Sequence, residues 1–162
     1  MLISDIKSGD LLYWKGEGFW PWLIRFWTRP KFWSLKPAPF FHVGVAWWNG
    51  VSLFITDASR EGVRCIPFHR DAPSHCQHTH SAWCDATTRL MREMIGKPYS
   101  YKTSFLTLFQ IAGHGSSAWM CSEYAVKILS TMGWGFGSYQ PTPEGLRRSV
   151  EDVSGFKVEV IE

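Results

Sequence analysis

The stretch FHVGVAWWNGVSLFITDA, from Phe41 to Ala58, decides the fold, because two strand-like runs in it are joined by Asn-Gly. Asn-Gly favours a two-residue hairpin loop of type I′, in which both central residues take positive φ. With Asn49 and Gly50 as that loop, counting outward along both runs places His42 directly opposite Asp57. Side chains alternate between the two faces of a strand, so this pair shares one face of the predicted sheet. The sequence thus predicts an antiparallel hairpin whose open end holds a histidine beside a carboxylate.

The same register places Gly44 opposite Ile55 and Ala46 opposite Leu53. Two small residues on one face leave room for another element to pack closely against it. A helix is the expected partner, and the segment CSEYAVKILSTMG, which begins at Cys121, has the spacing for one. Counted from Cys121, apolar residues follow at the third, fourth, seventh, eighth and eleventh positions, which is one side of an amphipathic helix. Cys121 therefore starts the predicted helix and lies on its buried side.

A cysteine at a helix start lies at the positive end of the helix dipole, beside backbone N–H groups without intrahelical partners. Such surroundings stabilise the thiolate, and the same N–H groups can form an oxyanion hole. With the helix on the hairpin face, Cys121, His42 and Asp57 would act as nucleophile, base and orienting carboxylate. In the non-catalytic interpretations, which stay open, Cys121 is buried as a small apolar residue and His42 forms only a structural hydrogen bond. His114 is a rival for the role of base.

Elsewhere the pattern alternates between short strands and helices without any Pro/Gly-rich linker or internal repeat. We therefore expect a single α+β domain over residues 1–162. Asp85 is the expected cap of the helix that starts there. The expected strands cover residues 11–14, 63–68, 77–83 and 156–162, and the expected helices cover residues 18–28, 85–96, 102–113 and 142–151.

Composition narrows the functional class. The chain has 162 residues, 45% of them hydrophobic, and a net charge of +3, which argues against disorder and gives no basic excess for nucleic acid. No apolar run is long enough to span a membrane, and the first residues do not resemble a secretion signal. We therefore expect a protein that is cytoplasmic as synthesised, with its 4 cysteines free of any disulfide scaffold.

Aromatic residues make up 16% of the chain, including 10 Trp, and they crowd with Lys and Arg between residues 13 and 48. This stretch has three interpretations: the wall of an active site, a surface that binds membrane, or a platform on which sugars or bases stack. The first is favoured, and Tyr13, Trp20 and Trp33 are the candidate substrate contacts.

The segment HRDAPSHCQHTHSAWC, residues 69–84, is rich in histidine and cysteine and raises the question of zinc. Its spacing fits no standard set of two plus two ligands, and the sequence contains no Cys-x-x-Cys pair. We therefore expect neither a metal nor an organic cofactor, and we interpret the segment as a polar strand and loop with surface histidines.

The motifs GDLLYW, FHVGVAWW, FITDASREGV, GKPYSYK, CSEYAVKIL and TPEGL occur in this order between residues 8 and 146. Together they resemble the circularly permuted papain-like cysteine hydrolases of the NlpC superfamily, especially the YiiX/YaeF-like amidase branch. In permuted members the histidine strand precedes the cysteine, as it does here. The resemblance implies a permuted papain-like fold, with Cys121 as nucleophile and His42 as base. The third residue in that branch is usually Glu, whereas this sequence has Asp57.

The resemblance also implies a reaction, namely hydrolysis of an amide bond through a thioacyl-enzyme. Relatives cut peptidoglycan stem peptides, so a peptidoglycan-derived peptide is the expected substrate, and action at the cell wall would need a separate export or lysis route. The alternatives are a lipid-directed thioesterase or acyltransferase, which would act at a membrane surface, and a non-catalytic binding module. The sequence leaves the scissile bond and the oligomeric state open.

Overall fold

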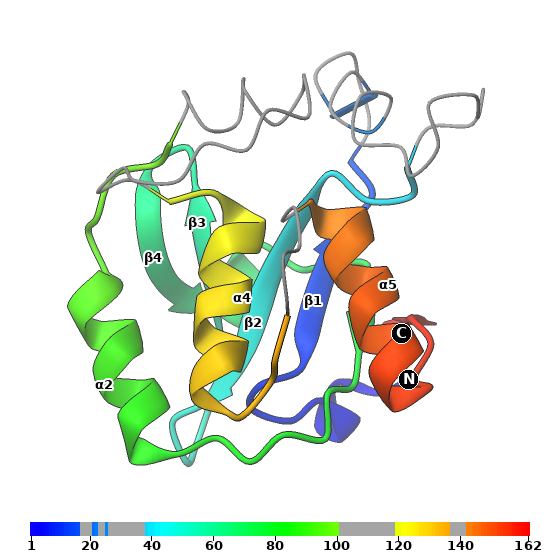
Figure 1. The fold of residues 1–162 in the computed structure, drawn as a ribbon. Coiled ribbons are helices and arrows are strands. Elements are labelled where there is room, and N and C mark those ends of the chain that lie inside the picture. The colour runs from blue at the N-terminus through cyan, green and yellow to red at the C-terminus, as the bar shows by residue number, and fades with distance from the viewer. Residues whose placement is uncertain (17–20, 23–24, 26–37, 101–118, 137–141) are drawn as a thin grey trace.

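The computed structural model describes residues 1–16, 21–22, 25, 38–100, 119–136 and 142–162. Within them the chain forms an α+β fold, in which one antiparallel sheet carries its α-helices on a single face (Figure 1). The strands are ordered β4-β3-β2-β1-β5-β6 across the sheet. They are β1 (Leu11–Trp14), β2 (His42–Trp48), β3 (Leu53–Ser59), β4 (Gly62–Pro67), β5 (His75–Gln77) and β6 (Glu159–Val160); the helices are α2 (Asp85–Met94), α4 (Cys121–Thr131) and α5 (Pro143–Ser154), with short 3-10 helices η1 (Ile3–Asp5) and η2 (Phe68–Arg70).

Alternation along the strands creates two apolar clusters, one on each face of the sheet. In β1, Leu11 and Tyr13 belong to the cluster beneath the helices, whereas Leu12 and Trp14 belong to the cluster on the opposite face. All four side chains are buried, so β1 lies within the sheet and is covered on both sides. Burying the apolar surface of both faces stabilises the sheet by roughly 25 cal/mol per Å² removed from water.

The hairpin of β2 and β3 forms where the sequence predicts it, but the predicted register is wrong. Ala46 pairs with Ile55 and Trp48 with Leu53, a shift of two residues from the expected pairs. The loop contains four residues because the Asn49 side chain accepts hydrogen bonds from the backbone N–H groups of the residues at positions 51 and 52. Asn49 does not take positive φ, so the type I′ turn is excluded. A shift of two keeps every side chain on its expected face.

Helix α4 forms as predicted but packs on the other face of the sheet. Its buried residues, such as Tyr124 and Ile128, contact the cluster that contains Val43 and Val45 rather than the face of Ala46. The physical reason is that Val43 and Val45 offer fully buried apolar surface, which stabilises the helix more than small residues would. Figure 1 shows that α4 and β2 begin at the same end of the sheet, so the helix start still lies near the start of β2.

The ends of the other helices follow their sequence signals in part. In α5, Thr142 is the N-cap and accepts a hydrogen bond from the N–H of Gly145, as expected of a helix that begins with Thr-Pro. In α2 the predicted cap is wrong, because Cys84 is the N-cap and Asp85 is the first helical residue.

The strand predicted over residues 77–83 is shifted, because β5 covers His75–Gln77, where it pairs with β1 and β6. The strands expected over 11–14 and 63–68 are confirmed, and the last strand is shorter than expected. The helix expected over 102–113 and most of the one over 18–28 lie outside the described residues. Among the described helices, none combines the length and the apolar character that crossing a bilayer requires.

Candidate active site

His42 and Asp57 form the centre of the candidate site. His42 begins β2, and its Nε2 atom lies 2.6 Å from Oδ2 of Asp57 on β3. Asp57 is fully buried, whereas 15% of the His42 side chain is exposed. The carboxylate therefore holds the imidazole from the protein interior and leaves one edge of the ring toward solvent.

Gly44 leaves the space in which the side chains of His42 and Asp57 can meet. The observed register makes His42 and Asp57 diagonal neighbours, and a Cβ atom at Gly44 would lie 3.2 Å from the Asp57 Cβ and 3.2 Å from Ile55 Cγ2. Diagonal neighbours on adjacent strands are farther apart than directly opposed ones, so the two side chains must lean toward each other. The missing side chain at Gly44 leaves the space in which they do so.

Cys121 begins α4, and its sulfur lies close enough to the His42 imidazole to raise the pKa of that ring. The preceding residue, Met120, is the N-cap, and its backbone N–H donates to Oε2 of Glu123 at 3.0 Å. Cys121 retains 6% of its accessible surface. The sulfur therefore lies between the imidazole and the positive end of the α4 dipole.

The electrostatics of the three residues favour a charged imidazole. Burial disfavours protonation of His42, but the neighbouring Cys121 sulfur and the hydrogen-bonded Asp57 outweigh it and raise the pKa of His42 to about 10. Burial likewise disfavours ionisation of Asp57, yet His42 and then Arg64 lower the pKa of its carboxyl below the ordinary value. The arrangement therefore favours an imidazolium between a sulfur and an ionised carboxylate.

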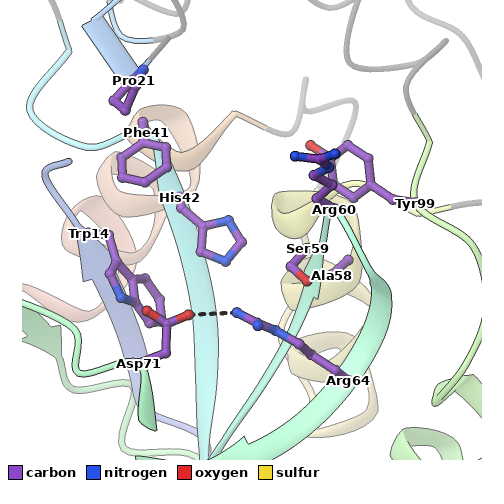
Figure 2. A pocket seen from close by; sticks show the side chains of 10 residues that line it. All are labelled: Trp14, Pro21, Phe41, His42, Ala58, Ser59, Arg60, Arg64, Asp71 and Tyr99. Atoms are coloured by element: carbon purple, nitrogen blue, oxygen red, sulfur yellow. Dashed lines mark hydrogen bonds and ion pairs between the residues drawn. The ribbon is translucent and has the colours of Figure 1, made fainter. Parts of the chain in front are cut away.

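His42 opens into a cleft of about 610 Å³, which Figure 2 shows from close by. The ring lies between Trp14 and Phe41 on one side and Arg60 and Tyr99 on the other. Trp14 and Phe41 approach it with ring centroids at 5.0 and 6.0 Å. The cleft is thus an apolar, aromatic slot with cationic side chains at one edge. Its lining comprises Trp14, Pro21, Phe41, His42, Ala58, Ser59, Arg60, Arg64, Asp71 and Tyr99.

The residues expected to contact substrate are distributed differently. Tyr13 is fully buried beneath the helices, where its hydroxyl donates to Oε1 of Gln77 at 2.9 Å, and it does not line the cleft. Trp20 and Trp33 lie outside the described residues, as does the rival base His114. Sequence reasoning missed Trp14 and Phe41, although each lies at the end of a predicted strand run next to the site, and that position was the signal available.

The segment rich in histidine and cysteine is less exposed than expected. His75 and Cys76 are buried in β5, and His78 is half-buried, so the expectation of surface histidines is wrong for this part of it. Ligand atoms of Asp10, Cys76 and His78 lie within 4.8 Å of one another. The Asp10 carboxylate already accepts the N–H of Lys7 at 2.8 Å and the Nδ1 contact of His78 at 2.7 Å.

Burial, followed by the nearby carboxylates of Asp10 and Glu159, raises the pKa of the Cys76 thiol well above its ordinary value. A thiol must lose its proton to bind a metal ion strongly. These observations support a structural cluster, in which Asp10 is hydrogen-bonded to His78 and Cys76 packs beside them, rather than a preformed metal site.

No protein-family model matches the chain, and no curated protein matches it either. Among solved structures it is similar to the crystal structure of the metalloprotein YiiX from Escherichia coli O157:H7, with a TM-score of 0.61 and 14% sequence identity. The alignment covers 83% of this chain and 71% of the other. A likeness at this identity is evidence of shared fold alone. The chain therefore has a YiiX-like α+β fold.

Proposed function

We propose that the protein is a cysteine hydrolase with a permuted papain-like active site of the NlpC type, and that Cys121, His42 and Asp57 are its catalytic residues. The observation that carries the proposal is the series of Cys121, His42 and buried Asp57, in which the imidazole lies beside the sulfur, is hydrogen-bonded to the carboxylate and lines the wall of a cleft. The YiiX-like fold supports the proposal. The order of the elements also supports it, because the histidine strand precedes the cysteine helix, as in the permuted hydrolases that the sequence resembles.

The reaction begins with attack of the Cys121 thiolate on a carbonyl carbon. The C–N bond of the amide breaks, His42 donates its proton to the leaving amine, and a thioester remains on Cys121. Water then attacks the thioester while His42 takes a proton from the water, which releases the acid and restores the thiolate beside the protonated imidazole. Backbone N–H groups at the start of α4 are positioned to stabilise the oxyanion in both steps.

The proposed substrate is an amide bond in a peptidoglycan stem peptide. The aromatic walls of the cleft suit an extended peptide that packs against Trp14 and Phe41. Purified muropeptides incubated with the protein should yield shorter products whose masses identify the bond that is cut. Cys121→Ala should abolish these products, and their persistence at the wild-type rate would refute the mechanism.

The apolar lining also supports a second candidate, a thioesterase or acyltransferase that acts on lipid acyl groups. The cleft could accept an acyl chain between the same aromatic side chains. Flotation with anionic vesicles separates the two: co-flotation, together with cleavage of acyl thioesters but not muropeptides, would favour the lipid substrate. YiiX is described as a metalloprotein, and chelation tests whether Asp10, Cys76 and His78 hold a metal ion in this chain.

A further inference from the structure

Arg64 lies directly opposite Asp57 in the pairing of β3 and β4. Its Nε donates to Oδ1 of Asp57 at 2.8 Å, and its Nη2 donates to Oδ2 at 3.2 Å. The guanidinium therefore contacts both oxygens of the carboxylate whose Oδ2 atom also binds His42. Such two-point contacts fix the plane of a carboxylate as well as its position.

A second carboxylate holds Arg64 from its far side. Nη2 of Arg64 donates to Oδ2 of Asp71 at 2.6 Å, the contact drawn as a dashed line in Figure 2. Exposure of the side chains falls from 42% at Asp71 to 23% at Arg64 and to 0% at Asp57. Charges thus alternate in sign from solvent to the fully buried carboxylate, and His42 ends the series.

We propose that Arg64 is a positioning residue for the catalytic histidine: it keeps buried Asp57 ionised and turns Oδ2 of that carboxylate toward Nε2 of His42. This inference rests on the proposed function. Its physical basis is that an isolated carboxylate is too costly to bury in charged form. His42 is a variable partner because its proton moves during the reaction, whereas a guanidinium keeps its proton at all working pH values. Arg64 is the partner that remains charged throughout the cycle.

The inference predicts what happens without the guanidinium. Asp57 would protonate at a higher pH, because one of the groups that favours its ionised form is gone. The imidazolium would then lose its hydrogen-bonded anion, and the thiolate of Cys121 would lose its cation. Alkylation of Cys121 by iodoacetamide measures thiolate directly, so the acidic limb of its pH profile reports this loss without knowledge of the substrate.

The experiment compares the full-length wild type with Arg64→Met and Arg64→Lys. Iodoacetamide rates at each cysteine are followed by peptide mass spectrometry, because Cys84 is exposed and Cys65 is half-buried. For Arg64→Met we expect the midpoint of the acidic limb for Cys121 to rise by about one pH unit. For Arg64→Lys we expect a midpoint near that of the wild type but a kcat lower by about tenfold, because a point charge does not fix the carboxylate plane.

Arg147 provides a matched control. It also pairs with two carboxylates, Glu144 at 2.9 Å and Glu151, but it lies on α5 and does not line the cleft. Arg147→Met should lower the melting temperature and leave the Cys121 alkylation profile unchanged. A shift of that profile in both Arg→Met variants would show general destabilisation and would overturn the inference.

The outcomes also separate this inference from the proposed function. If wild-type Cys121 reacts no faster than an ordinary thiol, the proposed function fails whatever Arg64 does. If wild-type Cys121 is reactive and folded Arg64→Met has the same profile and kcat, only the role of Arg64 is refuted. Should Arg64→Met not fold, Arg64→Lys decides, because an unchanged kcat in that variant is equally incompatible with positioning.

Discussion

The described chain contains two groups of cysteine, histidine and aspartate, and they differ in what surrounds the sulfur. Cys121 lies at the start of a helix, with its sulfur beside the His42 imidazole that opens into the cleft. Cys76 lies within strand β5, fully buried in the apolar cluster on the opposite face of the sheet. The comparison teaches that the same three residue types give different chemistry according to backbone position and nearby charge.

The aspartates differ in the same way. Asp57 faces His42 and the Arg64 guanidinium, so its negative charge is shared between two cationic partners. Asp10 mainly accepts backbone N–H groups, from Lys7 and Thr79, and its contact to His78 ties the end of β5 to the start of β1. The first aspartate therefore acts on a proton-carrying side chain, whereas the second holds turns of the backbone in place.

Replacing each cysteine by alanine should give the largest difference in activity between the two groups. Cys121→Ala should lower the rate of muropeptide cleavage by about a thousandfold or more, because the nucleophile is lost. Cys76→Ala should leave kcat unchanged and lower the free energy of unfolding by about 1–2 kcal/mol, because a buried side chain is truncated. Cleavage assays and urea titrations measure both. Equal losses of activity in the two variants would break the comparison.

Replacing each aspartate by its amide should give the next largest difference. Asp57→Asn should lower kcat by about 10- to 100-fold, since the amide no longer stabilises the His42 imidazolium. Asp10→Asn should keep kcat and cost about 1–3 kcal/mol in stability, because a buried acceptor of backbone N–H groups is altered. The relevant measurements are initial rates at saturating substrate and thermal unfolding. A full-rate Asp57→Asn variant would remove the orienting role from that residue.

The pH dependence of His42 sharpens the comparison further. Its pKa in the folded protein is raised from 6.5 to about 10. The stabilisation from its charged form is therefore complete below about pH 6.5 and is lost as the pH rises toward 10. Ring resonances followed by NMR should show His42 still protonated at about pH 8, and Cys121→Ala should lower its pKa because the largest favourable contribution is removed. A neutral wild-type His42 at that pH would contradict the charged pair.

Chelation should produce the smallest effect. Dialysis against a strong zinc chelator should change the melting temperature by less than about 1 °C, because the Asp10 oxygens already accept hydrogen bonds and the Cys76 thiol stays protonated. Elemental analysis of the purified protein checks the same point. One zinc per chain, lost on chelation together with several degrees of stability and absent from Cys76→Ala, would make the second group a metal centre.

Local sequence signals predicted the elements that carry the candidate site. The spacing from Cys121 to Leu129 depends only on which residues face the core, so it located α4 without any tertiary information. Alternation in β2 and β3 likewise placed His42 and Asp57 on one face, and an error of two residues in register left that result intact.

The hairpin register, the sheet face that α4 covers and the contact made by Arg64 could not be predicted from local sequence signals. The register depended on side-chain hydrogen bonds of Asn49, which outcompeted the turn preferred by Asn-Gly. The face chosen by α4 depended on the apolar area that Val43 and Val45 offer, which alternation alone cannot rank against the other face. Arg64 became visible only once β4 was paired with β3, because no motif in the sequence connects it to Asp57.

Gly44 gives the site a narrow steric tolerance. Because a Cβ atom there would approach Asp57 and Ile55 to 3.2 Å, even one added methyl group requires the neighbours to move by tenths of an ångström. The sheet as a whole can absorb such a displacement, but a hydrogen bond of 2.6 Å between Asp57 and His42 cannot keep its length and direction through it. The one glycine inside strand β2 therefore sets how much mutational change the pair of His42 and Asp57 can withstand.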